Sequence, residues 1–138
     1  MDAEIARLID EYSDRQDFSY AAPTQEAIMV AQQQLGVKLP GQYVEFLLRY
    51  GDGGFEGFEI LGVDLDGSMR FVEQTVEYRK LGLPSNLVVV EDCDEWVYCI
   101  DCDDGSVASW SPLDGARTDY PHFDSFLLQR IRDSVDDM

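Results

Sequence analysis

Basic residues are scarce in this sequence. Its 138 residues include ten Lys and Arg against 28 Asp and Glu, which gives a formal net charge of −18. Proteins that bind DNA or RNA directly contact the phosphate groups through Lys and Arg side chains. The charge therefore excludes direct nucleic-acid binding and leaves basic molecules as the partners that electrostatic attraction favours.

Long hydrophobic runs are also missing. The longest apolar runs are the five residues from Ala27 to Ala31 and the four from Leu87 to Val90. A helix that spans a bilayer needs about 20 apolar residues. The first residues, MDAEIARLIDEY, have neither the basic start nor the apolar segment of a secretory signal. We therefore expect no membrane segment and a cytoplasmic location.

The sequence has only three cysteines, and this odd number argues against a disulfide framework. Cys99 and Cys102 form a Cys-x-x-Cys pair, but the neighbouring aspartates should raise their thiol pKa values and so disfavour redox chemistry. A zinc site needs about four ligands, and only Cys93 and His122 remain to complete one. We expect free thiols packed in strands or turns, with no metal ion and no cofactor.

The single histidine, His122, lies just before the last expected helix. No nucleophile motif or organised triad accompanies it, which favours a loop or capping role. We therefore expect no catalytic residues and no enzymatic activity. A hydrolase or redox enzyme that uses His122 or the Cys-x-x-Cys pair is a third hypothesis, and replacing Cys99, Cys102 and His122 together without loss of function would dispose of it.

Apolar residues recur at helical spacing in five segments. The expected helices are residues 2–12, a second between the N-cap Thr24 and Gly36, a third with Pro40 in its first turn and Gly51 at its end, a short one at 71–80, and a last one at about 124–134 capped by Asp124 or Ser125. Residues 135–138 are expected to fray.

Short apolar segments between glycines predict strands in the second half of the chain. The expected strands are 58–63, 87–91, 95–101 and 107–111, the last two forming a hairpin around the turn Asp103–Ser106. Helices come first, strands lie in the middle and a helix comes last. This order predicts a single α+β domain, with a largely antiparallel sheet flanked by the N-terminal helices and the C-terminal helix.

Two further patterns look like ligand loops but lack the required spacing. The glycines between Gly51 and Gly54 precede no lysine and no expected helix, so they are interpreted as a helix end and a turn and not as a phosphate site. The acidic segments 64–67 and 101–105 do not place their glycines and ligands as an EF-hand loop does. We expect turns there too.

The segment from Glu91 to Asp104 contains seven acidic residues and no basic one, with Trp96 in its middle. Such a segment can be a solvated face that keeps the protein soluble. It can equally be a docking surface, on which carboxylates steer a basic partner and an aromatic side chain anchors it. The candidate partner-binding residues are Asp92, Asp94, Glu95, Trp96, Asp103 and Asp104.

The stretch LGVKLPGQYVEFLLRYGDGGF, from Leu35 to Phe55, resembles the signature of the SUKH superfamily, in which a helix, a Leu-Pro turn, a helix bearing Tyr or Phe and a Gly-rich stop occur in order. Later segments follow the same family order at 59–62, 87–90, 96–101 with 107–110, and 126–127. The resemblance covers about residues 20–132, after a separate N-terminal helix. It departs at Cys93–Trp96, where many relatives have a turn containing glycine.

Membership would imply an α+β fold without catalytic residues. It would also imply a role like that of many bacterial SUKH proteins, which are immunity factors that bind and neutralise polymorphic or contact-dependent toxins, often nucleases. A nuclease is basic because it holds phosphate, and a strongly acidic protein can occupy that surface. The expected partner is thus a cognate, basic toxin domain. The alternative is a regulatory or scaffolding adaptor, like the eukaryotic relatives that control cell-wall synthesis.

Overall fold

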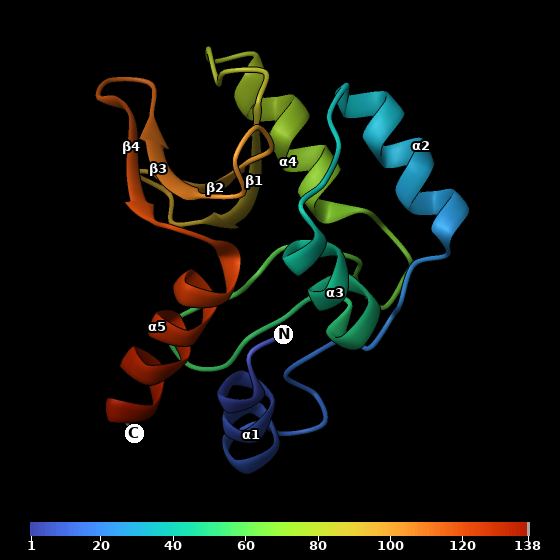
Figure 1. Cartoon of the computed structure of the whole chain (residues 1–138), viewed down its shortest axis with the longest axis vertical. Helices are drawn as coiled ribbons and strands as arrows, with labels where there is room; N and C mark the ends of the chain where they lie inside the picture. Colours follow the sequence, from blue (N-terminus) through green and yellow to red (C-terminus); the bar gives the residue numbers. More distant parts are fainter. Residues whose placement is uncertain (138) are drawn as a thin grey trace.

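The protein is described by a computed structural model that covers residues 1–137. Within this range the chain forms five helices and four strands (Figure 1). The helices are α1 (Ala3–Tyr12), α2 (Gln25–Leu35), α3 (Gly41–Tyr50), α4 (Arg70–Arg79) and α5 (Phe123–Asp136). The strands are β1 (Leu87–Asp92), β2 (Val97–Asp101), β3 (Val107–Ser111) and β4 (Gly115–Tyr120). The α+β fold class expected from the sequence is confirmed.

The four strands form one antiparallel sheet in the order β1-β2-β3-β4, so each strand pairs with its neighbour in the chain. The expected hairpin is confirmed, because Ile100 pairs with Val107 and Val97 with Trp110. β4 was not predicted from the sequence. Most of its residues are exposed, so the segment lacks the alternation of apolar and polar residues by which a half-buried strand is recognised.

Helices α4 and α5 cover opposite faces of the sheet. Successive side chains of a strand point to opposite faces, so Val97 and Tyr98 differ in direction. The Tyr98 ring lies 5.0 Å from Phe126 of α5 between centroids. Trp110, which pairs with Val97, lies 6.3 Å from Tyr78 of α4. The sheet is thus held between two helices, and α1 packs against α5 (Figure 1).

Aromatic side chains fill the core between the helices and the sheet. The largest fully buried ones are Tyr43, Phe46, Phe71, Phe123 and Phe126. Tyr43 donates its hydroxyl hydrogen bond to the carbonyl oxygen of Leu61. A buried tyrosine needs such an acceptor, because an unpaired hydroxyl would be costly in this apolar setting. The Leu61 N–H in turn donates to the carbonyl oxygen of Val90 in β1 at 2.7 Å, at the position where the pairing of β1 with β2 is interrupted.

The strand expected at residues 58–63 is absent. Ile60 and Val63 make only isolated bridges, to Gly53 and Met69 respectively. Ile60 and Gly53 exchange hydrogen bonds of 2.8 and 2.9 Å, and Gly53 has a φ of 127°, which favours glycine. The Gly-rich stretch is therefore more than the helix end and turn expected from the sequence, since it brings two loops into backbone contact.

His122 caps α5, in agreement with the capping role expected for it. Its Nδ1 accepts a hydrogen bond of 3.2 Å from the N–H of Ser125, whose hydroxyl donates back to the carbonyl of His122. The expectation that Asp124 or Ser125 is the cap was wrong by two or three positions. The helix continues to Asp136, so residues 135 and 136 are helical, whereas Met138 lies outside the described residues. Pro40 is likewise the N-cap of α3 and not part of its first turn.

Candidate protein-binding site

Four of the six candidate residues meet at the turn between β1 and β2. Asp92 ends β1, Asp94 and Glu95 form the turn, and Trp96 precedes β2. All four are exposed, and the Trp96 side chain is 40% exposed. The structure thus places three acidic residues and one accessible aromatic side chain in the same short segment, although the Asp92 carboxylate is directed towards Tyr78 of α4. Exposed carboxylates next to an exposed aromatic residue suit contact with a basic partner.

Backbone hydrogen bonds hold the β1–β2 turn in one shape. The N–H of Cys93 donates to the carbonyl of Trp96 at 3.0 Å, and the N–H of Asp94 donates to the carboxylate of Asp92 at 2.9 Å. Tyr78 of α4 donates its hydroxyl to the same carboxylate at 3.0 Å. Burial first, and this hydrogen bond second, raise the pKa of Tyr78 to about 12. The turn is therefore fixed to the body of the domain by α4.

Asp94 has a φ of 67°, a left-handed conformation that glycine adopts at little cost. The sequence resemblance marks this turn as the place where many relatives have a glycine. Aspartate and asparagine tolerate the same conformation better than most residues do. The chain thus keeps a glycine-like backbone here while adding a carboxylate to the surface.

The other two candidate residues lie at the opposite end of β2. Asp103 and Asp104 belong to the β2–β3 turn, and the length of β2 separates them from Trp96 by about 14 Å or more at the rise of a strand. Asp104 accepts hydrogen bonds from the N–H and the hydroxyl of Ser106, at 2.9 and 2.6 Å. These bonds lower the pKa of Asp104. The six residues therefore form two groups, one at each end of the hairpin.

Glu91 does not belong to the acidic surface, although the sequence places it in the acidic segment. It is 3% exposed and forms a bidentate ion pair with Arg130 of α5, with both N–O distances 2.8 Å. The guanidinium also lies 5.6 Å from the centre of the Tyr98 ring. This pair ties α5 to the sheet, which is a structural role.

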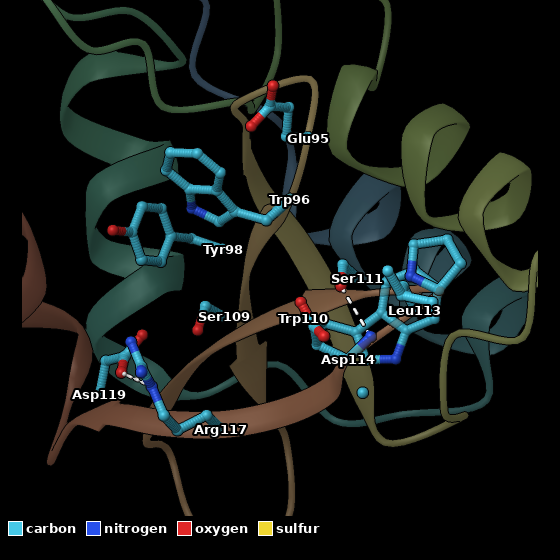
Figure 2. A pocket seen from close by; sticks show the side chains of 12 residues that line it. Glu95, Trp96, Tyr98, Ser109, Trp110, Ser111, Leu113, Asp114, Arg117 and Asp119 are labelled. Carbon is cyan, nitrogen blue, oxygen red and sulfur yellow. Dashed lines mark hydrogen bonds and ion pairs between the residues drawn. The ribbon is translucent and has the colours of Figure 1, made fainter.

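A hollow of about 800 Å³ lies over β2, β3 and β4, between the β1–β2 turn and the β3–β4 turn (Figure 2). Trp96 and Tyr98 line one side, their rings in edge contact at 6.2 Å. Leu113 and Asp114 of the β3–β4 turn line another side. The hollow therefore begins at one of the two acidic groups, and it does not include the residues of the β2–β3 turn.

Leu113 stands at the tip of the β3–β4 turn and is 91% exposed. The turn is tight, since Ser111 pairs with Gly115 and accepts a hydrogen bond of 3.0 Å from the N–H of Asp114. Neither Leu113 nor this turn was identified from the sequence. A lone leucine in a polar segment gives no periodic signal, and only the pairing of β2, β3 and β4 brings it into the lining of the same hollow as Trp96.

The charged side chains of the hollow are three carboxylates and one guanidinium. They belong to Glu95, Asp114, Asp119 and Arg117. Arg117 pairs with Asp119 at 2.8 Å, and the side chains are 81% and 18% exposed respectively. The hollow is therefore acidic overall, and its one cationic side chain is mostly exposed to solvent.

All three cysteine thiols have raised pKa values. Burial, followed by acidic neighbours, raises the thiol pKa values of Cys93 and Cys102 to about 12. Burial raises the pKa of the Cys99 thiol further. The sequence argument attributed the rise to the aspartates alone, whereas loss of solvent is the larger cause. Among residues 1–137 no three His, Cys, Asp or Glu side chains converge in a way that could hold a metal ion.

Within the described part of the chain, no helix has the length and apolar character needed to cross a membrane.

The fold is similar to that of a protein from Pseudomonas syringae pv. tomato with a known crystal structure. The two chains are 24% identical, the similarity covers 83% of this chain and 88% of the other, and the TM-score is 0.66. A family model, SUKH_5, described as SMI1-KNR4 cell-wall, matches residues 5–132 and so includes most of α1. This match spans nearly the whole chain, and the chain belongs to the SMI1-KNR4 family of the SUKH superfamily.

Proposed function

We propose that this protein is a cytoplasmic immunity protein that binds a cognate toxin domain in a stoichiometric complex and neutralises it without catalysis. The observation that carries the proposal is the exposed Trp96 next to exposed acidic residues, on a SUKH domain with a net charge of −18. The family, whose members are generally non-catalytic, and the protonated, partly buried thiols support a binding role over an enzymatic one.

The charge makes a basic toxin, such as a nuclease, the fitting partner. A nuclease carries Lys and Arg at its substrate surface because it must hold phosphate. Opposite charges on two proteins accelerate their association and make the rate fall as salt is added. An acidic protein can thus reach the toxin quickly and cover the surface that the nucleic acid would use.

Co-expression tests this proposal. The C-terminal domain of a large open reading frame beside this gene is expressed alone and together with the protein. We expect the domain to kill cells alone and to be silenced in the presence of this chain through a complex that dissociates with added salt. A toxic domain that is not bound or silenced would contradict the proposal.

Charge reversal tests which surface is used. Glu95→Lys with Asp103→Lys changes one carboxylate at each end of the hairpin, and neither side chain makes a hydrogen bond in the structure of residues 1–137. We expect association with the toxin domain to slow at least about tenfold. The control, Asp10→Lys with Glu26→Lys, makes the same change of charge on exposed positions of α1 and α2. Equal effects of the two double variants would show that net charge, and not this surface, governs binding.

The description of the matched family model favours a second candidate function. It names the cell wall, in line with a regulatory or scaffolding adaptor of cell-wall synthesis. An adaptor would have a stable partner in its own cell and no toxin gene nearby. Affinity capture from the native cell that yields such a partner, with no toxic domain encoded beside the gene, would favour this candidate over the immunity protein.

A further inference from the structure

We propose that the hollow between Trp96 and Leu113 is the docking groove for a loop of the partner that carries an arginine, and that this arginine takes the place of Arg117 beside Asp119. The inference rests on the proposed function and names the face that binds. It assigns the contact to the β1–β2 end of the hairpin and to β4, and not to Asp103 and Asp104 at the other end.

The apolar side chains of the hollow point to a protein loop as its occupant. Leu113 is 91% exposed and Trp96 is 40% exposed, so both leave apolar surface in contact with water. Exposed apolar side chains mark contact sites when they share a concave surface. The volume of about 800 Å³ is in the range of pockets that accept several side chains. Figure 2 shows Trp96 and Leu113 apart from each other among the residues that line the hollow.

The charges of the hollow select a cationic occupant. Its lining has three carboxylates and one guanidinium, and Asp92 and Asp94 add further negative charge at the β1–β2 turn. Binding of a neutral or acidic loop would remove water from these carboxylates without supplying an opposite charge in its place. A basic loop would gain both pairing and long-range attraction.

Arginine fits this hollow better than lysine does. Trp96 and Tyr98 present two aromatic rings beside the carboxylates, and a guanidinium both stacks on such rings and pairs with a carboxylate in a bidentate way. The same combination of an ion pair and a cation–π contact already occurs at Tyr98, where Arg130 pairs with Glu91 and lies over the Tyr98 ring. The hollow offers a second arginine the same combination of groups.

Asp119 is the carboxylate that such an arginine would pair with. Its side chain is only 18% exposed, and its cation, Arg117, is 81% exposed. An exposed ion pair contributes about 1 kcal/mol or less, so exchanging its cation costs little. The partner's arginine would be shielded from water by the loop that carries it, which strengthens its pairing with Asp119.

A second acidic hollow of about 410 Å³ provides an internal comparison. Asp64 and Asp66 line it together with Leu65, which is 84% exposed. Its lining lacks an exposed aromatic side chain that could stack on a guanidinium. If charge and one exposed leucine were enough, both hollows would bind a basic loop equally well, whereas we expect the hollow beside Trp96 to bind it alone.

The binding test uses a peptide and does not require the toxin. Acetyl-Gly-Arg-Leu-Arg-Gly-amide is titrated into the full chain while amide and tryptophan indole signals are followed by NMR. We expect saturable shifts at Trp96 and the β3–β4 turn. Replacing each arginine by citrulline, a neutral residue of the same shape, should weaken binding at least about fivefold. Absence of shifts at Trp96, or equal binding of the citrulline peptide, would overturn the inference.

Variants then separate this inference from the proposed function. Trp96→Ala and Leu113→Ala should each weaken binding of the peptide and of the toxin domain at least about fivefold, whereas Leu65→Ala leaves both unchanged. Toxin binding that survives both alanine variants but is lost in Asp103→Lys would overturn the groove while the immunity function stands. Failure of the wild-type chain to bind the toxin domain would instead overturn the immunity function.

Discussion

The backbone at Asp94 shows how one residue shapes the binding surface. A left-handed φ of 67° is free of strain for glycine, moderately costly for aspartate and more costly for a β-branched residue. The Asp94 carboxylate makes no hydrogen bond within the described residues, so substitutions there report on the backbone.

We therefore expect Asp94→Gly to leave the free energy of unfolding unchanged or to raise it by up to about 1 kcal/mol, and Asp94→Val to lower it by about 1 to 2 kcal/mol. Urea unfolding of the two variants measures the difference. Glu95→Val, at the next exposed position of the turn, is the control for loss of an acidic side chain. A valine at position 94 that is as stable as glycine would contradict the turn geometry.

The thiols provide a second test at the scale of single residues. The raised pKa values of Cys93 and Cys102, about 12, mean that both thiols stay protonated at pH 8 in the folded protein. Only the thiolate reacts with an alkylating or disulfide reagent. We expect labelling at pH 8 to be at least about tenfold slower than in the urea-unfolded chain, and to accelerate as the pH rises. Rapid labelling of the native chain would restore the redox hypothesis.

At the scale of elements, α5 depends on a cap that the sequence only partly indicated. The N–H of Ser125 needs an acceptor at the helix start, and the Nδ1 of His122 supplies it. We expect His122→Ala to lower the free energy of unfolding by about 1 kcal/mol and His122→Asn to keep it near the wild-type value, because asparagine is a good N-cap. Thermal unfolding at neutral pH distinguishes the two. Equal loss in both variants would mean that the cap does not stabilise α5.

The helices were predictable because each carries its own signal. Apolar spacing and end residues such as Thr24, Gly36 and Gly51 placed the first four helices to within about a residue or two of their ends. β4 gave no such signal, because its exposed edge position requires no apolar alternation. The segment 58–63 has the composition of a strand, but bridges to Gly53 and Met69 hold it as a loop.

The residues of the candidate site likewise divide into those that the local sequence indicates and those that it does not. The exposed residues of the β1–β2 turn were predicted from local charge and an aromatic residue. Leu113, Arg117 and Asp119 were missed because strand pairing across the sheet brings them into the same hollow as Trp96. Glu91 was counted as acidic surface, since a buried ion pair with a residue 39 positions away leaves no trace in the local sequence.

At the scale of the whole molecule, negative charge far exceeds what the fold neutralises. Four of the ten Lys and Arg side chains form ion pairs within the described residues: Arg7, Lys80, Arg117 and Arg130. The remaining carboxylates repel one another across the surface. Salt screens this repulsion, which is stronger in the compact state than in the unfolded chain.

We therefore expect the Tm to rise by a few degrees when the salt concentration is raised from about 0.02 to 0.5 M. Choline chloride and sodium chloride should act alike if general screening is the cause. A Tm that falls with salt would contradict net repulsion as the dominant effect. A rise with one salt and not the other would indicate a specific ion and also contradict it.

The same charge underlies the proposed recognition of a basic toxin, and one measurement tests this most directly. The toxin domain encoded beside the gene is mixed with the purified chain, and complex formation is measured at low and at physiological salt. The account predicts a tight stoichiometric complex that neutralises the toxin and weakens as salt is added. It also predicts that Trp96→Ala weakens this complex. A toxin that keeps its activity beside excess protein, or a complex indifferent to both salt and Trp96, would contradict the account.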